Sequence, residues 1–573
     1  MPLQHSGRRR ARIAVPRAVG RFERWLGCAI LEAGGIIPLS AGSEMSGVGD
    51  QKADFIVVGA TVAGLRAALN LSQAGRVVVL SKVGSQISDG RHAEALSAPS
   101  DEDKVALHFH DTLSAGDGVC GEDAVRILFD EAPARIEEVI GWGRQAGHET
   151  KLVFSAEGTH SRPCLLRAQG TSTAGEMLRV LEARARPLHG LHLQSHAYPV
   201  DLIVEEGRVC GVMYLDEKTS AFRRVRAKAV LISTGGLGQA YRETTNLPAA
   251  SGDGVAMAWR AGAVIRNMEF VEFHPTTLHV KGAPPVPLPE SLRSEGAYLR
   301  NVDLERFMPQ HHEAGELAPR DILSRAIALE MQKCHSSFVY LDLTRFDSEK
   351  LQKRFPRVYE TCLRYNVDIA ADLIPVQPAA HFSVGGIATD FNGATTLPSL
   401  YAAGEAASSG VHGANYLPGN SLLEELVFGA RAAQGMIDGR RSDLSLPEAP
   451  GIARTRAGSG RSPAQPQPGG SREGMLSNLQ SLMSEKVGVI RRGKELHEAV
   501  RWLESASLPE CQHPSRVQYE QRDLLEVARL IARSALTREE SRGVHYRADF
   551  PLRDETHPPR QSLARGNEPI VLS

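Results

Sequence analysis

A short apolar run that leads into a glycine-containing turn near residue 54 constrains the fold more than any other part of this chain. Residues 54–59 (Asp-Phe-Ile-Val-Val-Gly) predict a buried strand, and residues 59–64 (Gly-Ala-Thr-Val-Ala-Gly) predict a turn that opens a helix over residues 65–71. Residues 76–80 predict a second strand at the distance that closes a βαβ unit. Such units build parallel sheets covered by helices, so the sequence predicts an α/β domain.

The same turn is a candidate nucleotide site. In such a unit a pyrophosphate lies at the helix N-terminus, where unpaired amides and the helix dipole favour anions. Gly59 and Gly64 fill the first and third glycine positions of the fingerprint, but Thr61 stands at the second and is expected to crowd or reorient the phosphates. Ser81 and Lys82 replace the acidic residue expected after the second strand. Taken alone, the segment fits a nucleotide site and an ordinary strand-turn-helix equally well.

Two polar segments in the middle of the chain indicate chemistry. Residues 269–276 contain His274, and residues 289–296 contain Glu290 and Arg293. Such a histidine and arginine can bind a dicarboxylate and move a proton beside it. The segments resemble the succinate dehydrogenase, fumarate reductase and L-aspartate oxidase family of flavoproteins. The resemblance implies an α/β FAD-binding (Rossmann-like) domain, an inserted α+β capping domain and a C-terminal helical bundle.

Three further segments resemble the flavin-binding regions of this family, although each could also be an ordinary α/β crossover. They are the strand that ends at Gly235, the segment 400–405 that ends at Glu405, and the helix start at residues 420–424. The cofactor-binding residues that the resemblance implies are Gly59, Thr61, Gly64, Ser81, Lys82, Gly235, Asp253, Glu405, Asn420, Ser421 and Leu422. No Ser-His-Thr element marks covalent attachment, so the expected cofactor is noncovalent FAD.

Residues 157–161 (Glu-Gly-Thr-His-Ser) resemble a Glu-Gly-Gly-His-Ser element of L-aspartate oxidases, as residues 251–262 and 316–327 resemble other segments of them. The glutamate of that element faces the substrate α-ammonium, a group that succinate lacks. A buried carboxylate is costly unless it is paired, so Glu157 is expected to select a cationic partner. A solvated loop glutamate is the alternative.

The resemblance also implies roles in the reaction. His274 and His381 are expected to bind the substrate carboxylates, with hydrogen-bonded core histidines as the alternative. Arg293, flanked by Glu290, is the expected proton shuttle. An arginine has a pKa above about 12, so this role requires a dry site and a carboxylate relay.

Three departures from the family pattern concern the active site. Tyr416 stands where the family places an arginine that clamps a substrate carboxylate, Pro289 stands where a threonine is common, and residues 91–95 replace a Gly-rich loop. Losing a bidentate arginine removes the strongest carboxylate contact a protein can offer. Weak aspartate activity, another substrate and a degenerate flavoprotein without activity are therefore all compatible with the sequence.

The function that this reasoning predicts is FAD-dependent oxidation of L-aspartate to iminosuccinate, which would feed quinolinate and NAD synthesis. O2 or fumarate is the expected electron acceptor, and quinolinate synthase is a candidate partner. The alternatives are a soluble fumarate reductase or succinate dehydrogenase flavoprotein that works with an iron-sulfur partner, and a scaffolding relic without flavin.

Composition restricts the remaining possibilities. The formal net charge of −1 gives no reason to expect a nucleic-acid partner, and no segment is long and apolar enough to predict a membrane span. Seven cysteines without a C-x-x-C pair suggest a reducing compartment, so the protein is expected to be cytoplasmic.

The expected domain organisation follows the changes in composition along the chain. Residues 1–50 form a basic extension that is expected to be disordered, with an organellar presequence or a true start at Met45 as alternatives. The further boundaries are 51–262 and 382–440 for the FAD-binding domain, 263–381 for the capping domain, 441–474 for a linker, 475–555 for the helical domain and 556–573 for a tail.

Overall fold

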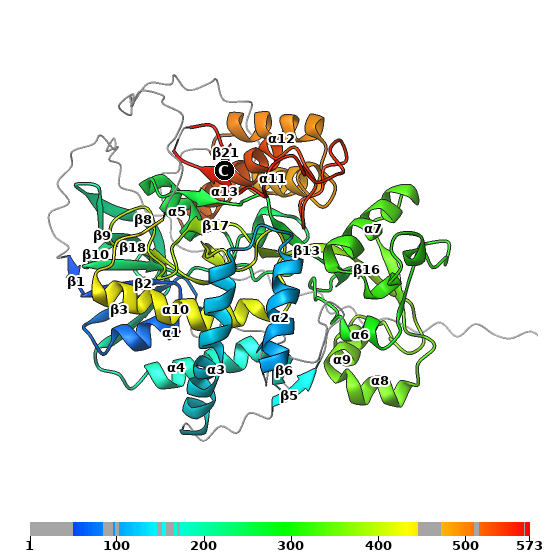
Figure 1. Cartoon of the computed structure of the whole chain (residues 1–573), viewed down its shortest axis with the longest axis horizontal. Helices are drawn as coiled ribbons and strands as arrows, with labels where there is room; N and C mark the ends of the chain where they lie inside the picture. The colour runs from blue at the N-terminus through cyan, green and yellow to red at the C-terminus, as the bar shows by residue number, and fades with distance from the viewer. Residues whose placement is uncertain are drawn as a thin grey trace, which may run out of the picture. The chain divides into compact units, whose positions relative to one another are not determined.

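The computed structural model contains a five-stranded parallel sheet, whose strands β18, β2 and β3 are labelled at the left of Figure 1. Its order is β18 (Leu400–Ala402), β11 (Ala229–Ile232), β2 (Phe55–Val58), β3 (Val77–Ser81) and β7 (Leu191–Ser195). Every residue of β2, β3 and β11 is buried, as a sheet covered on both faces requires. The structure describes residues 50–83, 96–97, 102–145, 152–155, 165–168, 172–444, 472–508, 515–566 and 568–573.

Helices cover one face of this sheet. The covering elements are α1 (Val62–Leu71), α3 (Glu122–Gln145), α4 (Thr173–Ala185) and α10 (Asn420–Asp438), and their apolar side chains share one hydrophobic cluster with β2 and β3. The helix α1 connects β2 to β3, and these two strands pair in parallel from Phe55↔Val77 to Val58↔Leu80. The βαβ unit predicted from the sequence is therefore confirmed.

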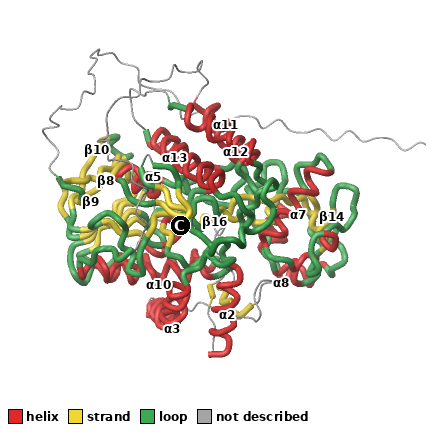
Figure 2. The backbone as a smooth tube through the Cα atoms, turned by 45° about the horizontal axis from the view of Figure 1, so that its top comes forward, coloured by secondary structure: helices red, strands yellow, loops and turns green. Residues whose placement is uncertain are grey.

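The other face packs against a second sheet and the C-terminal helices. The second sheet has the order β1 (Gln51–Lys52), β10 (Ala221–Arg226), β9 (Arg208–Asp216) and β8 (Ala197–Glu205). Side chains of both sheets form a second hydrophobic cluster, and four helices pack into it (Figure 2). These helices are α5 (Asp253–Ala261) and the C-terminal helices α11 (Arg472–Lys486), α12 (Gly493–Ser505) and α13 (Arg516–Thr537). Among the described helices, none combines the length and apolarity needed to cross a membrane.

A separate antiparallel sheet has its own hydrophobic cluster. Its order is β13 (Val271–Leu278), β16 (Ile374–Ser383), β15 (Val339–Asp342) and β14 (Tyr298–Arg300). The helices of this segment are α6 (Ser291–Ser294), α7 (Arg320–Lys333), α8 (Ser348–Arg354) and α9 (Pro356–Arg364). This sheet and its helices form the α+β part inserted between β11 and β18, as the predicted fold class requires.

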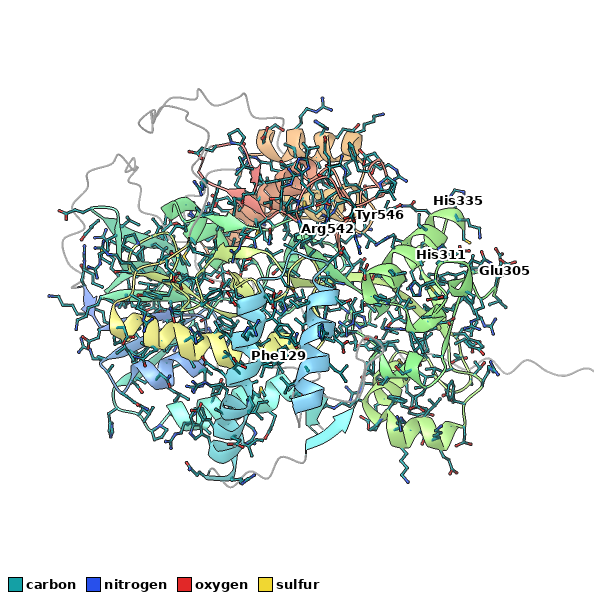
Figure 3. All side chains as sticks on the ribbon, in the orientation of Figure 1. Phe129, Glu305, His311, His335, Arg542 and Tyr546 are labelled. Carbon is teal, nitrogen blue, oxygen red and sulfur yellow. The ribbon has the colours of Figure 1, made fainter. Side chains whose placement is uncertain are left out.

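The C-terminal part differs in detail from the sequence expectation. The helical pattern over residues 476–503 divides into α11 and α12, which are separated by a turn around the buried Arg491. The expected tail includes β20 (Ser562–Ala564) and β21 (Val571–Leu572), which extend the sheet of β12 (Ile265–Arg266), β17 (Gly386–Ala388) and β19 (Ala407–Ser408). Tyr546, labelled in Figure 3, packs under the guanidinium of Arg325 from α7 at 4.4 Å.

The remaining described elements are α2 (Glu102–Ala115), β4 (Leu96–Ser97), β5 (Leu152–Ser155), β6 (Leu165–Ala168) and the short 3-10 turns η1 (Gly238–Ala240), η2 (Met308–Gln310), η3 (Gly315–Leu317) and η4 (Gly404–Ala406). The helix α2 packs beside α3 through the edge-to-face contact of His108 with Phe129 at 4.8 Å between ring centroids. This contact lies close to the start of α10, where His108 also bonds Asn420.

Candidate active site

A cavity of about 460 Å3 opens at the carboxyl ends of β2, β3 and β11. This edge is where open α/β sheets bind ligands. The predicted cofactor residues that line it are Gly59, Thr61, Ser81, Lys82, Gly235, Asp253, Glu405, Ser421 and Leu422. His381 and Tyr416 line the same cavity, so the candidate cofactor and substrate residues meet in one space.

Glycines hold the backbone close at the start of α1. Gly59 has a φ of +108°, and a Cβ atom there would lie 2.1 Å from the carbonyl oxygen of Ser233. A Cβ atom on Gly64 would lie 2.1 Å from the carbonyl oxygen of Gly59. Gly235 also has a positive φ, +79°, but a Cβ atom there would meet nothing within 4 Å. Gly59 and Gly64 are therefore required for the tight turn, whereas Gly235 leaves open space.

Thr61 is the N-cap residue of α1. Its hydroxyl accepts a hydrogen bond from the Gly64 amide at 3.2 Å, and its backbone is extended with a φ of −80°. A threonine adopts this conformation without strain, and a capping hydroxyl stabilises the helix. Because the Gly64 amide donates to this hydroxyl, it is not free to donate to a phosphate. The expected effect of Thr61 on phosphate binding stays a prediction.

The wall of the cavity after β3 carries a buried ion pair. Lys82 donates to Ser251 Oγ at 2.6 Å and to Asp253 Oδ1 at 2.9 Å, and its ammonium lies 3.5 Å from Glu520 Oε1. A lysine after β3 is thus neutralised by Asp253, the first residue of α5. The pair explains how this chain tolerates a cation where an acidic residue is expected.

Two buried oxygens in the cavity wall have no hydrogen-bond partner within the described part of the chain. They are Asp253 Oδ2 and Thr234 Oγ1. Buried polar atoms are normally bonded, so these oxygens are suited to a ligand rich in hydroxyl and amide groups. Together with the glycine turn and the helix start, they fit a dinucleotide such as FAD.

Asn420 and Glu405 support the cavity in different ways. The Asn420 amide bonds His108 Nε2 at 2.8 Å and Thr112 Oγ1 at 2.9 Å, which fixes the start of α10 against α2. Glu405 accepts from the Ser383 amide at 2.9 Å and from its hydroxyl at 3.1 Å. Burial raises the pKa of Glu405 to about 7. Asn420 therefore holds the start of α10 against α2, whereas Glu405 lines the cavity.

His274 and His381 come together because β13 and β16 pair in antiparallel register, with His274 opposite Ala379. Their ring centroids lie 5.3 Å apart. His381 Nδ1 bonds Thr245 Oγ1 at 2.7 Å, whereas His274 Nδ1 has no hydrogen-bond partner among the described residues. Burial, and then the charge of Arg320, lower the pKa of His274 well below its usual value. His274 is therefore neutral and carries an unused ring nitrogen.

Arg293 and Glu290 are both buried, and a second arginine joins them. Arg293 donates to Thr276 Oγ1 at 2.9 Å, and its Nη2 lies 3.8 Å from Glu290 Oε1. Arg320 donates through Nε to Glu290 Oε2 at 3.3 Å. The three side chains form a line in which Glu290 lies between two guanidinium groups.

Arg320 is the functional candidate that sequence reasoning did not assign. Its Nη1 lies 3.5 Å from Glu272 Oε1, and its guanidinium lies 5.9 Å from the ring centroid of Tyr416. Burial raises the pKa of Glu272 to about 7. One signal was available, since Arg320 opens α7, where the helix dipole disfavours a cation.

Tyr416 belongs to an aromatic cluster at the end of the cavity. Its ring stacks on Phe382 at 4.5 Å and lies 5.8 Å from His412 and 6.4 Å from His381. The side chain is 7% exposed. Where the family has an arginine, this chain therefore has a packed aromatic side chain without charge. The guanidinium of Arg320 lies near the ring of Tyr416.

Two sequence predictions cannot be placed. Glu157, the expected partner of a substrate ammonium, lies outside the described residues, and so do residues 91–95. Both stay predictions.

Comparisons with known proteins agree with this geometry. Residues 54–422 match a family model described as FAD binding domain, and residues 476–571 match one described as Fumarate reductase flavoprotein C-term. An L-aspartate oxidase of Streptomyces coelicolor is 38% identical over 553 residues, which cover 91% of this chain and 93% of that protein. A chloroplastic L-aspartate oxidase of Nicotiana tabacum is 37% identical over 550 residues, which cover 88% of this chain and 82% of that protein. A solved structure of E. coli quinol fumarate reductase is similar with a TM-score of 0.79 at 28% identity, over 91% of this chain and 96% of that one.

Proposed function

Because the chain belongs to the L-aspartate oxidase family of flavoproteins, we propose that it oxidises L-aspartate to iminosuccinate with FAD as cofactor. The family membership confirms the resemblance that the sequence motifs predicted. The observation that carries the proposal is the cavity itself, because it runs from the glycine turn of Gly59 to His381 and Tyr416. A cofactor at one end and a small acid at the other would therefore share one cavity.

FAD, when bound, supplies the acceptor for the hydride that leaves Cα of L-aspartate. The amine loses one proton in the same oxidation, and the carbon–nitrogen bond becomes a protonated imine. The protein has to hold two carboxylates, orient the Cα hydrogen and receive this proton. We assign these tasks to His381, which lines the cavity, and to the buried side chains that pack behind His381 and Tyr416.

His274 and His381 are assigned to the substrate carboxylates. The Thr245 hydroxyl fixes the His381 ring, and the unused Nδ1 of His274 can bond a ligand oxygen. Because burial keeps His274 neutral, its contribution is a hydrogen bond and not a charge. The positive charge comes from Arg320, whose guanidinium lies 5.9 Å from the ring centroid of Tyr416, a residue that lines the cavity.

Proton transfer is assigned to the line of Arg320, Glu290 and Arg293. The two guanidinium groups lie 3.3 Å and 3.8 Å from the oxygens of Glu290. The Arg320 guanidinium first gives one proton to the Glu290 carboxylate, and the neutral guanidine that results then takes the proton from the substrate amine. The proton lost by the substrate is thus balanced by the proton gained on Glu290, and Arg293 lies on the other side of this carboxyl group. This burial provides the dry site and carboxylate relay that an arginine base requires. Glu157 is retained as the proposed partner of the substrate ammonium.

The electron acceptor and the next enzyme remain part of the proposal. The imine product hydrolyses readily, which favours an enzyme that consumes it directly, and we propose quinolinate synthase for this role. We propose O2 or fumarate as acceptor, since relatives with the same fold include quinol fumarate reductases.

Turnover of the FAD-loaded protein tests the proposal. L-Aspartate should give ammonia, which is released when the imine hydrolyses, and succinate should react much more slowly. Turnover of succinate without turnover of L-aspartate would instead assign the chain to succinate or fumarate chemistry.

A further inference from the structure

A carboxylate occupies the helix N-terminus at which a dinucleotide pyrophosphate is expected. Glu425 lies in the first turns of α10 and reaches the start of α1. The two helices lie side by side in Figure 1. Its Oε2 accepts a hydrogen bond from the Ala63 amide at 3.1 Å, and the Val62 amide also bonds this carboxylate. Glu425 lines the cavity together with the turn from Gly59 to Val62. The anion site of α1 is therefore filled by the protein's own side chain.

The surroundings of Glu425 contain further acids. Glu405 lies on η4 and Glu424 precedes Glu425 on α10, and both repel its negative charge. Glu424 itself bonds Ser409 and the ring of His412. Among the described residues, no lysine, arginine or histidine lies within ion-pair distance of the Glu425 carboxylate. Burial raises the pKa of Glu425 to about 8, so its neutral form predominates at pH 7.

A bound FAD would bring two phosphate charges to the same amides. An ionised Glu425 would repel them, and turning the side chain away would separate a buried carboxylate from its two amide donors. Gly404 packs close to the stem of Glu425, since a Cβ atom added there would lie 3.2 Å from Glu425 Cγ. A protonated Glu425 removes the charge and gains an O–H group that can donate to a phosphate oxygen.

We propose that Glu425 is a cofactor-binding residue that must be protonated in the FAD complex, so that FAD binding above neutral pH is coupled to the uptake of one proton. The inference rests on the FAD cofactor of the proposed function. It predicts tight binding below the pKa of Glu425 and a dissociation constant that rises roughly tenfold per pH unit above it. Glu405 titrates near the same cavity, so the contribution of Glu425 is the difference between the wild type and a Glu425 variant.

The test is isothermal titration of the full-length apoprotein with FAD between about pH 6 and pH 9, in pairs of buffers with different ionisation enthalpies. The proton count per bound FAD is obtained from the buffer dependence of the heat. In the wild type it should rise towards one at the alkaline end. At the alkaline end, Glu425→Gln should take up nearly one proton fewer per bound FAD than the wild type. At about pH 9 the variant should bind FAD roughly tenfold more tightly than the wild type.

Asp438→Asn is the matched control, since Asp438 lies at the other end of α10 and is partly exposed. It should reproduce the wild-type proton count. Equal proton counts and equal pH profiles in the wild type and Glu425→Gln would overturn the inference while leaving the cofactor in place. Absence of FAD binding by both proteins at every pH would overturn the cofactor assignment itself, and this inference with it.

Discussion

Replacing Arg320 by lysine tests which arginine receives the substrate proton. Sequence reasoning assigned this role to Arg293, whereas the structure places Arg320 beside Tyr416 and Arg293 behind Glu290. Lysine keeps the charge but lacks the planar fork of donors, so it cannot reproduce both the Nε contact of Arg320 with Glu290 and the Nη1 contact with Glu272. In the wild type these contacts measure 3.3 Å and 3.5 Å, and all three side chains are buried.

The expected size of the effect follows from one lost contact. A hydrogen bond to a charged group contributes about 1.5 to 3 kcal/mol. Its loss should lower kcat for L-aspartate roughly 10- to 150-fold. Arg293→Lys should have a smaller effect, because Arg293 contacts Thr276 and the far side of Glu290.

The assay is steady-state oxidation of L-aspartate by FAD-loaded protein, with flavin content measured in each variant. Arg325→Lys is the matched control on the same helix, since Arg325 pairs with Asp321 and has a partly exposed side chain. It should change kcat by no more than about twofold. A larger loss in Arg293→Lys than in Arg320→Lys, at equal flavin content, would refute the order of the relay.

Three further predictions concern other residues of the cavity. Tyr416→Arg should lower KM for L-aspartate and raise kcat/KM by roughly one to two decades, because it adds a bidentate carboxylate contact. Steady-state kinetics measure both parameters, and no gain would show that the stacking of Tyr416 on Phe382 is required. Thr61→Gly should raise FAD occupancy by freeing the Gly64 amide, and unchanged occupancy in the purified protein would mean that the cap does not compete with the phosphates. Burial raises the pKa of Glu272 to about 7 in the folded protein, above its value in the unfolded chain. The contribution of Glu272 to the free energy of unfolding is therefore complete below the unfolded pKa and is lost as the pH rises through the folded pKa. Glu272→Gln should therefore flatten the decline of apoprotein stability over that range, by up to about 3 kcal/mol in denaturant unfolding, and an unchanged slope would contradict the buried acid.

The local part of the fold could be predicted from the sequence. The βαβ unit follows from two apolar runs and a glycine turn within 30 residues, because strand and helix periods and turn chemistry are local properties. His274 and His381 are far apart in sequence, and only their match to family motifs placed them together. The antiparallel pairing of β13 and β16 supplies the physical reason.

Contacts between distant elements could not be predicted. Arg320 lies in the matched segment 316–327, but the resemblance assigned it no role, and its contacts with Glu290 and Glu272 depend on how α7 packs against β13. Glu425 reads from the sequence as one of two adjacent glutamates on a helix. Its bond to Ala63, 362 residues away, exists because α10 lies alongside α1. The sequence shows that Lys82 replaces the acidic residue expected after β3. It does not show the partners of Lys82, because Asp253 lies on α5 and Glu520 on α13.

Anaerobic addition of L-aspartate to the FAD-loaded protein tests the central claim most directly. The visible absorbance of oxidised flavin should be lost with L-aspartate and should be lost much more slowly with succinate. It should persist with L-aspartate when His274 and His381 are both replaced by alanine. An oxidised spectrum that persists with L-aspartate in the wild type, while FAD stays bound, would contradict the central claim.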